Sequence, residues 1–197
     1  VVEPKQMLRF FNWHVDTGPM VNYEIDMWDR IEKDINNEDI NSASAKLRRG
    51  LEEFTRYICH NLHAEVPYTL GDTGSLGDFM PAAIGQYKKL INKARNSANK
   101  WGKADVYDNL TETQSIAEQI IKRTFAEEWA INKAVHYNQW ANFSKKDFQP
   151  IYEAFRDLCN IVFTCPNTVC GSLIKAVYDG PKIVGVKCNC GEINWNL

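Results

Sequence analysis

The sequence predicts a mainly α protein, a helical bundle domain that is closed by a small C-terminal segment of β structure. Apolar residues recur at spacings of three and four through most of residues 25–162, which is the period of helices with one buried face. Residues 163–197 are instead rich in β-forming side chains and contain the turn signal Asp179-Gly180-Pro181. Residues 1–24 carry short β-like runs and are interpreted as a lead-in segment.

Five helical stretches are predicted within the bundle. Their expected bounds are about 26–37, 41–63, 78–101, 104–129 and 144–162, and a sixth short helix is an alternative within 129–143. The third stretch is expected to use Asp78 as its N-cap. The fifth begins with Ser144-x-x-Asp147, which is typical of a capping box.

The apolar stripes also predict which large side chains face the core. In the third stretch the stripe ends at Trp101, and in the fourth it runs from Val106 to Phe125. Apolar side chains at helical spacing share one face, so we expect these three to be buried.

The tail carries the clearest chemical signal in the chain. Four of the six cysteines form two close pairs, Cys165-x4-Cys170 and Cys188-x-Cys190, and each pair is followed by glycine. A hairpin between the pairs would bring four thiolates together, and glycine lets the backbone turn at each knuckle. Four sulfur donors at tetrahedral angles are typical ligands of structural zinc. We therefore predict a zinc ribbon over 163–197, with zinc as its cofactor.

The spacing of these cysteines leaves alternatives open. The usual knuckle is C-x2-C, whereas this chain has gaps of four residues and of one. Two disulfides, or free buried thiols, are the alternatives to a metal site. No secretion signal accompanies the cysteines, which favours reduced thiols and a cytoplasmic location. A closed four-cysteine site would hold the fold together and leave no open position for catalysis.

Composition places few limits on function. The chain has 197 residues, a formal net charge of −2 and 44% hydrophobic residues, which are ordinary values for a globular protein. The small negative charge provides no overall attraction to nucleic acid or membranes. No stretch is long and apolar enough to span a bilayer. The chain begins Val1-Val2 without methionine, and we interpret it as part of a longer protein.

One face of the third helical stretch is basic. Lysines and asparagines recur along it at helical spacing, and no acidic residue occurs between Phe79 and Ala104. The lysines of this face are Lys89, Lys93, Lys100 and Lys103. Lysines spaced in this way can neutralise successive phosphates, which makes nucleic acid the candidate partner. An ordinary solvated helix surface is the alternative.

A second functional hypothesis concerns Arg56 and His63. Their R-x6-H pattern is similar to the R-x4-6-H pattern of HEPN-type ribonucleases, in which arginine and histidine act on a phosphodiester. Residues seven apart share one face of any helix, so a structural role is the alternative.

The run His136-Tyr137-Asn138-x-Trp140 could line a pocket, and a network at the edge of the core is the alternative. The chain contains no Walker A loop, dinucleotide fingerprint, G-x-S-x-G or H-E-x-x-H motif. We therefore expect no enzyme activity that is complete within this chain.

Five stretches carry a resemblance to a known kind of protein. They are LRRGLEEF (47–54), ANKWG (98–102), EEWAINKAVHYNQWANFSKKDFQP (127–150), CPNTVCG and CNCGEINWNL. They resemble the C-terminal region of large bacterial ATPases of the AAA or SMC-like type, which are suspected of roles in DNA repair or defence against phage. The first knuckle of that pattern has a two-residue gap, where this chain has four.

The resemblance implies an accessory domain and transfers no catalytic residue, because the ATPase motifs would lie upstream. We therefore expect a non-catalytic appendage of a larger bacterial ATPase, with a regulatory, partner-binding or nucleic-acid-binding role. The HEPN-like nuclease that uses Arg56 and His63 is the alternative.

Overall fold

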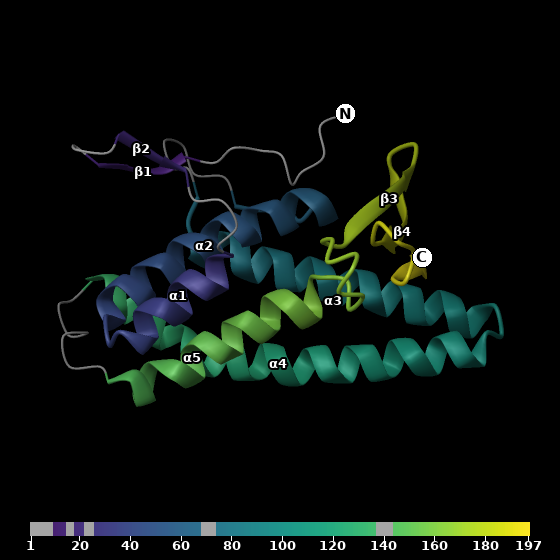
Figure 1. Ribbon diagram of the computed structural model, residues 1–197. Coiled ribbons are helices and arrows are strands. Elements are labelled where there is room, and N and C mark those ends of the chain that lie inside the picture. The colour runs from purple at the N-terminus through teal and green to yellow at the C-terminus, as the bar shows by residue number, and fades with distance from the viewer. Residues whose placement is uncertain (1–9, 15–17, 22–25, 68–73, 137–143) are drawn as a thin grey trace.

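The computed structural model describes residues 10–14, 18–21, 26–67, 74–136 and 144–197. Its helices are α1 (Met27–Asn36), α2 (Ile40–Leu62), α3 (Leu76–Lys100), α4 (Ala104–His136) and α5 (Lys145–Asp157). The protein is mainly α, as predicted, and α3 and α4 form a long hairpin that extends beyond the other helices (Figure 1). Within the described ranges, no helix combines the length and the apolar character that a membrane crossing needs.

Hydrogen bonds at the helix starts correct one predicted boundary. α3 begins at Leu76, and its N-cap is Ser75 rather than Asp78. The Asp78 carboxylate accepts hydrogen bonds from the Ser75 backbone N–H and from the Ser75 hydroxyl, each at 2.8 Å. These bonds lower the pKa of Asp78, which acts from the third helical position of a capping box. Ser144 and Asp147 cap α5 in the same way, as predicted.

α4 is longer than the sequence predicts. It continues past residue 129 to His136, so part of the predicted sixth helix belongs to α4. The other members of the polar-aromatic run, Tyr137, Asn138 and Trp140, lie outside the described residues.

α5 ends in a π-helical turn, η3 (Leu158–Val162), from which the chain enters the tail. A widened turn of this kind leaves backbone groups without their usual helical partners. Here the Thr164 hydroxyl donates a hydrogen bond of 2.8 Å to the Cys159 carbonyl oxygen. The side chain of Thr164 thus stabilises the end of the helix.

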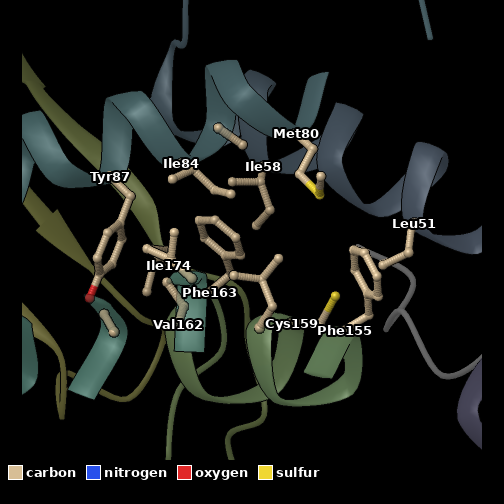
Figure 2. Close-up of a cluster of buried hydrophobic side chains, with 14 of the residues drawn as sticks. Leu51, Ile58, Met80, Ile84, Tyr87, Phe155, Cys159, Val162, Phe163 and Ile174 are labelled. Atoms are coloured by element: carbon tan, nitrogen blue, oxygen red, sulfur yellow. The ribbon is translucent and has the colours of Figure 1, made fainter. Parts of the chain in front are cut away.

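The core extends from the helices into the start of the tail. Figure 2 shows Phe163 at the centre of a buried cluster, between Ile58 and Ile84 on one side and Val162 and Cys159 on the other. The Phe163 side chain is fully buried. Burial of a phenylalanine side chain contributes about 1.5–3 kcal/mol, so this residue is a substantial link between the tail and the bundle.

Three side chains that are expected in the core are exposed. Trp101, Val106 and Phe125 have 53%, 45% and 41% of their surface accessible. Trp101 and Val106 lie at the tip of the α3–α4 hairpin, which projects past the helices that could cover it (Figure 1). On α4, Thr124 is buried in place of its neighbour Phe125. The Thr124 hydroxyl lies 3.4 Å from the Ala154 carbonyl oxygen of α5.

Two small antiparallel sheets complete the fold. Their strands are β1 (Phe10–His14) and β2 (Gly18–Val21) in the lead-in, and β3 (Lys175–Asp179), β4 (Lys182–Lys187) and β5 (Asn194–Asn196) in the tail. In the tail sheet β4 lies between β3 and β5. The predicted turn joins β3 to β4, and Gly180 adopts there a φ of 56°, which glycine accepts without strain.

Aromatic side chains attach this sheet to α2 and α3. The Trp195 ring of β5 is 9% exposed and lies 5.7 Å from the Tyr87 ring of α3. The Tyr178 ring of β3 lies 4.8 Å from the ring of His63, the C-cap residue of α2. Val186 of β4 is fully buried in the same cluster as the helix residues. The bundle and the tail therefore share one hydrophobic core.

Gly185 of β4 lies where a side chain has no room. An added Cβ atom would lie 2.7 Å from the Trp195 carbonyl oxygen of β5. We predict that Gly185→Ala lowers the free energy of unfolding by about 1–3 kcal/mol, because the two strands must move apart.

Gly85 of α3 supplies a matched control, because a Cβ atom there meets no atom within 4 Å apart from its own stretch of helix backbone. Gly85→Ala should raise the free energy of unfolding by up to about 1 kcal/mol through helix propensity. Urea denaturation followed by circular dichroism measures both variants. Equal stability of Gly185→Ala and the wild type would contradict the close β4–β5 contact.

Candidate metal centre

Four cysteine side chains from two loops meet beside the tail hairpin. Cys165 and Cys170 lie between η3 and β3, and Cys188 and Cys190 follow β4. Their Sγ atoms all lie within 4.8 Å of one another, so the group can hold a metal ion. Pairing of β3 with β4 brings the two loops together, because Lys175 at the start of β3 is opposite Lys187 at the end of β4.

Two of the distances between the sulfurs are close to those of a tetrahedral metal site. The Cys190 Sγ lies 3.6 Å from the Cys165 Sγ and 3.5 Å from the Cys188 Sγ. Sulfurs that each lie about 2.3 Å from a central zinc ion are roughly 3.8 Å from one another. A disulfide needs an S–S distance of about 2.05 Å. The cysteines are free thiols in the structure, so the disulfide alternative does not describe this arrangement.

Asn167 shapes the first knuckle. Its side-chain oxygen accepts hydrogen bonds from the backbone N–H groups of Val169 and Cys170, at 3.0 and 3.3 Å. Its carbonyl oxygen accepts from the N–H groups of Cys170 and Gly171. The φ of Gly171 is 49°, in the left-handed region that favours glycine. This turn absorbs the two extra residues of the C-x4-C gap.

The second knuckle is held by Ile193. Its backbone N–H donates to the Cys188 Sγ at 3.2 Å, and its carbonyl oxygen accepts from the Cys188 N–H at 3.0 Å. Gly191 has a φ of 86°, which lets the chain reverse directly after Cys190. A one-residue gap is therefore enough to place both sulfurs in the cluster.

Ser172 connects the two knuckles. The Asn189 backbone N–H, from the second knuckle, donates to the Ser172 Oγ at 2.9 Å. The same Oγ lies 3.1 Å from the Cys170 Sγ of the first knuckle. Asn167 and Ser172 are supporting residues that the sequence analysis does not identify, although an asparagine in a short loop before cysteine is typical of such a turn.

Hydrogen bonding and burial act in opposite directions on the thiols. The hydrogen bond with the Ser172 hydroxyl lowers the pKa of Cys170 to about 6, which favours its thiolate at neutral pH. Burial raises the pKa of Cys165 to about 12. Because metals bind the thiolate form, a cation at the centre would favour deprotonation of all four residues.

The other two cysteines belong to the helical core. Cys59 and Cys159 are buried, and burial raises the pKa of both thiols. The Cys59 Sγ donates a hydrogen bond of 3.2 Å to the Phe79 carbonyl oxygen. These residues pack the bundle and are not part of the four-sulfur group.

The predicted basic face is exposed to solvent. Lys89, Lys93 and Lys100 lie on this face and are exposed. Lys103 is also exposed, but it lies beyond the end of α3, after the chain reversal at Gly102, and its carbonyl oxygen accepts from the Tyr107 N–H of α4. The Arg95 guanidinium lies on the side of α3 that faces α4, because it donates hydrogen bonds to Tyr107, Thr111 and Gln114 of α4. Lys93 is two residues, or about 200°, from Arg95 around the helix. The lysine row of α3, which consists of Lys89, Lys93 and Lys100, therefore faces away from α4.

Arg56 and His63 each make contacts that stabilise the fold. The Arg56 guanidinium lies 5.1 Å from the Phe79 ring centroid and 3.9 Å from a Glu52 carboxylate oxygen. His63 has a φ of 52°, ends α2 and packs against Tyr178. The joint action of Arg56 and His63 on a phosphodiester stays a prediction.

Comparisons with known proteins identify no relative. No protein-family model matches the chain, and no curated protein or solved structure matches it. The resemblance to bacterial ATPases therefore stays a prediction.

The role of Asn167 can be tested through metal affinity. Asn167→Ala removes the side-chain acceptor for two backbone N–H groups and should weaken metal binding roughly tenfold, as loss of a supporting residue typically does. Thr168→Ala is the matched control, because this neighbouring residue is exposed and its side chain makes no described hydrogen bond. Competition with a chelator measures both affinities. Unchanged affinity in Asn167→Ala would show that the turn forms without this side chain.

Proposed function

We propose that this chain is a non-catalytic accessory module in which structural zinc holds the C-terminal hairpin against a helical bundle. The observation that carries this proposal is the group of four cysteine sulfurs beside a core that bundle and tail share. A site with four protein sulfurs leaves no open position for water or substrate, and structural sites of this kind contribute directly to folding.

The chemistry of the donors supports zinc as the metal. Thiolates select soft metals, and a tetrahedral set of four sulfurs suits zinc or iron. Zinc is colourless because its d shell is filled, whereas iron with four thiolates absorbs visible light. The proposal places the protein in the cytoplasm, where such thiols stay reduced and available to a metal.

The sequence resemblance supports the larger context of the proposal. We propose that the module is attached to a bacterial ATPase, and that ATP hydrolysis takes place in another part of that protein. The metal-stabilised bundle then serves as a binding or regulatory surface.

Nucleic acid is the partner that we propose for this surface. The lysine row of α3 faces solvent over about 16 Å from Lys89 to Lys100, at a rise of 1.5 Å per residue. The absence of acidic residues from the whole of α3 after Asp78 leaves this charge uncompensated on its own helix. Such a row can follow several phosphates of one strand.

Metal analysis tests the structural part of the proposal. Protein purified without added metal should contain about one zinc ion per chain, and Cys188→Ser should lose the zinc and unfold the tail. Cys59→Ser is the matched control, because Cys59 lies outside the site and a hydroxyl can also donate to the Phe79 carbonyl. Elemental analysis and near-ultraviolet circular dichroism measure both effects. Wild-type protein without metal, or equal zinc in the Cys188→Ser variant, would contradict the proposal.

Salt-dependent binding tests the partner. Replacement of Lys89, Lys93 and Lys100 by glutamine should reduce the slope of log affinity against log salt for a single strand by about 2, at about 0.7 per phosphate contact. Glutamine at Lys33, Lys122 and Lys146, which are exposed on α1, α4 and α5, gives a control of equal net charge. Fluorescence anisotropy with a labelled oligonucleotide measures the slope. The same slope in both triple variants would exclude the α3 face as the contact.

A further inference from the structure

A tryptophan stands at the far end of the lysine row. Trp101 is the C-cap residue of α3, and 53% of its surface is exposed. It lies at the tip where α3 turns into α4, which extends past the ends of the other helices (Figure 1). About half of the Trp101 surface is therefore accessible to a partner.

Lysines flank this ring. The Lys103 Nζ lies 5.5 Å from the Trp101 ring centroid, within the range of a cation–π contact. Lys100 precedes the tryptophan directly, and its side chain is exposed. An aromatic face and cationic groups therefore occupy one small surface, which we call the hairpin tip (Lys100–Lys103) and which continues the basic face of α3.

The backbone of the hairpin tip is well defined by hydrogen bonds. The N–H groups of Trp101, Gly102 and Lys103 donate to carbonyl oxygens of the last turn of α3, at 3.0, 3.1 and 3.0 Å. Gly102 has a φ of 65°, which places the chain reversal at a residue without a side chain. The backbone that carries the tryptophan and the two lysines is thus defined before any partner binds.

Acidic residues restrict where a polyanion can lie on this hairpin. Asp105, Asp108 and Glu112 are exposed on the first turns of α4, at spacings of three and four that place them on one face. The lysine row points away from α4, as the contacts of Arg95 establish. Charge complementarity therefore directs a polyanion along α3 to Trp101 and away from the acidic face of α4.

We infer that the hairpin tip binds single-stranded nucleic acid, with a base stacked on Trp101 and the neighbouring phosphates next to Lys100 and Lys103. This inference rests on the nucleic-acid contact that is proposed above for the lysine row. Bases of a duplex are stacked on one another and offer no free ring face, whereas a single strand can place a base on an aromatic side chain. The combination of an exposed indole with a row of lysines thus favours a single strand over a duplex.

The experiment compares a labelled single strand with a duplex of the same length, by fluorescence anisotropy at low salt. Trp101→Ala should weaken binding of the single strand at least about fivefold and leave duplex binding unchanged. Trp101→Phe should retain most of the affinity, because phenylalanine also offers a ring face. Trp101 is exposed, so all variants should keep the metal content and circular dichroism of the wild type.

Tryptophan fluorescence provides an independent readout. Saturation with the unlabelled single strand should quench part of the wild-type emission, and this quenching should be absent in Trp101→Phe. Such a loss of signal assigns the quenched emission to Trp101, and quenching that persists in Trp101→Phe would contradict the inference.

The outcomes separate this inference from the proposed function. If the lysine variant loses affinity while Trp101→Ala binds the single strand normally, base stacking is overturned and the phosphate contact stands. If the wild type binds neither single strand nor duplex, both proposals fail. If wild-type protein prefers the duplex, the hairpin tip does not select a single strand and the inference is overturned.

Discussion

Tyr87 of α3 lies at the contact on which the association of bundle and tail depends. Its ring meets Phe163, at the exit from the helices, with 5.8 Å between centroids, and Trp195, on the last strand, with 5.7 Å. A tail of this size cannot bury a sufficient core by itself, so it must share the core of the bundle. Cys165 follows Phe163 by two residues, and Cys188 is joined to Ile193 by two hydrogen bonds. Phe163 and Cys165 lie in one short segment, and Cys188 and Trp195 lie in another. The aromatic contact and the sulfur group therefore link the same two segments to the fold, and we expect loss of either one to weaken the other.

The helices were predictable because apolar residues recur at spacings of three and four, and this spacing indicates which helix face is buried. Local capping was predictable at Ser144 and Asp147, where the signal is unambiguous. At the start of α3 both Ser75 and Asp78 are capping residues, and only the hydrogen-bond geometry decides that the serine is the N-cap. Trp101 shows a more general limit. Periodicity identifies the face of a helix, but it does not reveal whether another element covers that face at the tip of a projecting hairpin.

The group of four cysteines was predictable, because paired thiols with following glycines have few other structural uses. Its supporting residues were not predictable in the same way. Asn167 and Ser172 are common loop residues, and their importance arises only from the turn that directs them towards backbone N–H groups and the Cys170 sulfur. Arg56 and His63 show the reverse case. A spacing of seven predicts that both share one helix face, but His63 lies at the end of α2 with a left-handed φ of 52°, and each side chain has a structural contact of its own.

X-ray absorption at the zinc edge tests the central claim most directly, because it reports the identity and distance of the atoms that surround the metal. The protein should be purified without added metal and measured as the full chain. We predict four sulfur neighbours at about 2.3 Å, with no nitrogen or oxygen in the first coordination shell. A mixed shell of sulfur with nitrogen or oxygen, or protein without bound zinc, would contradict a closed four-cysteine site that joins the tail to the helices.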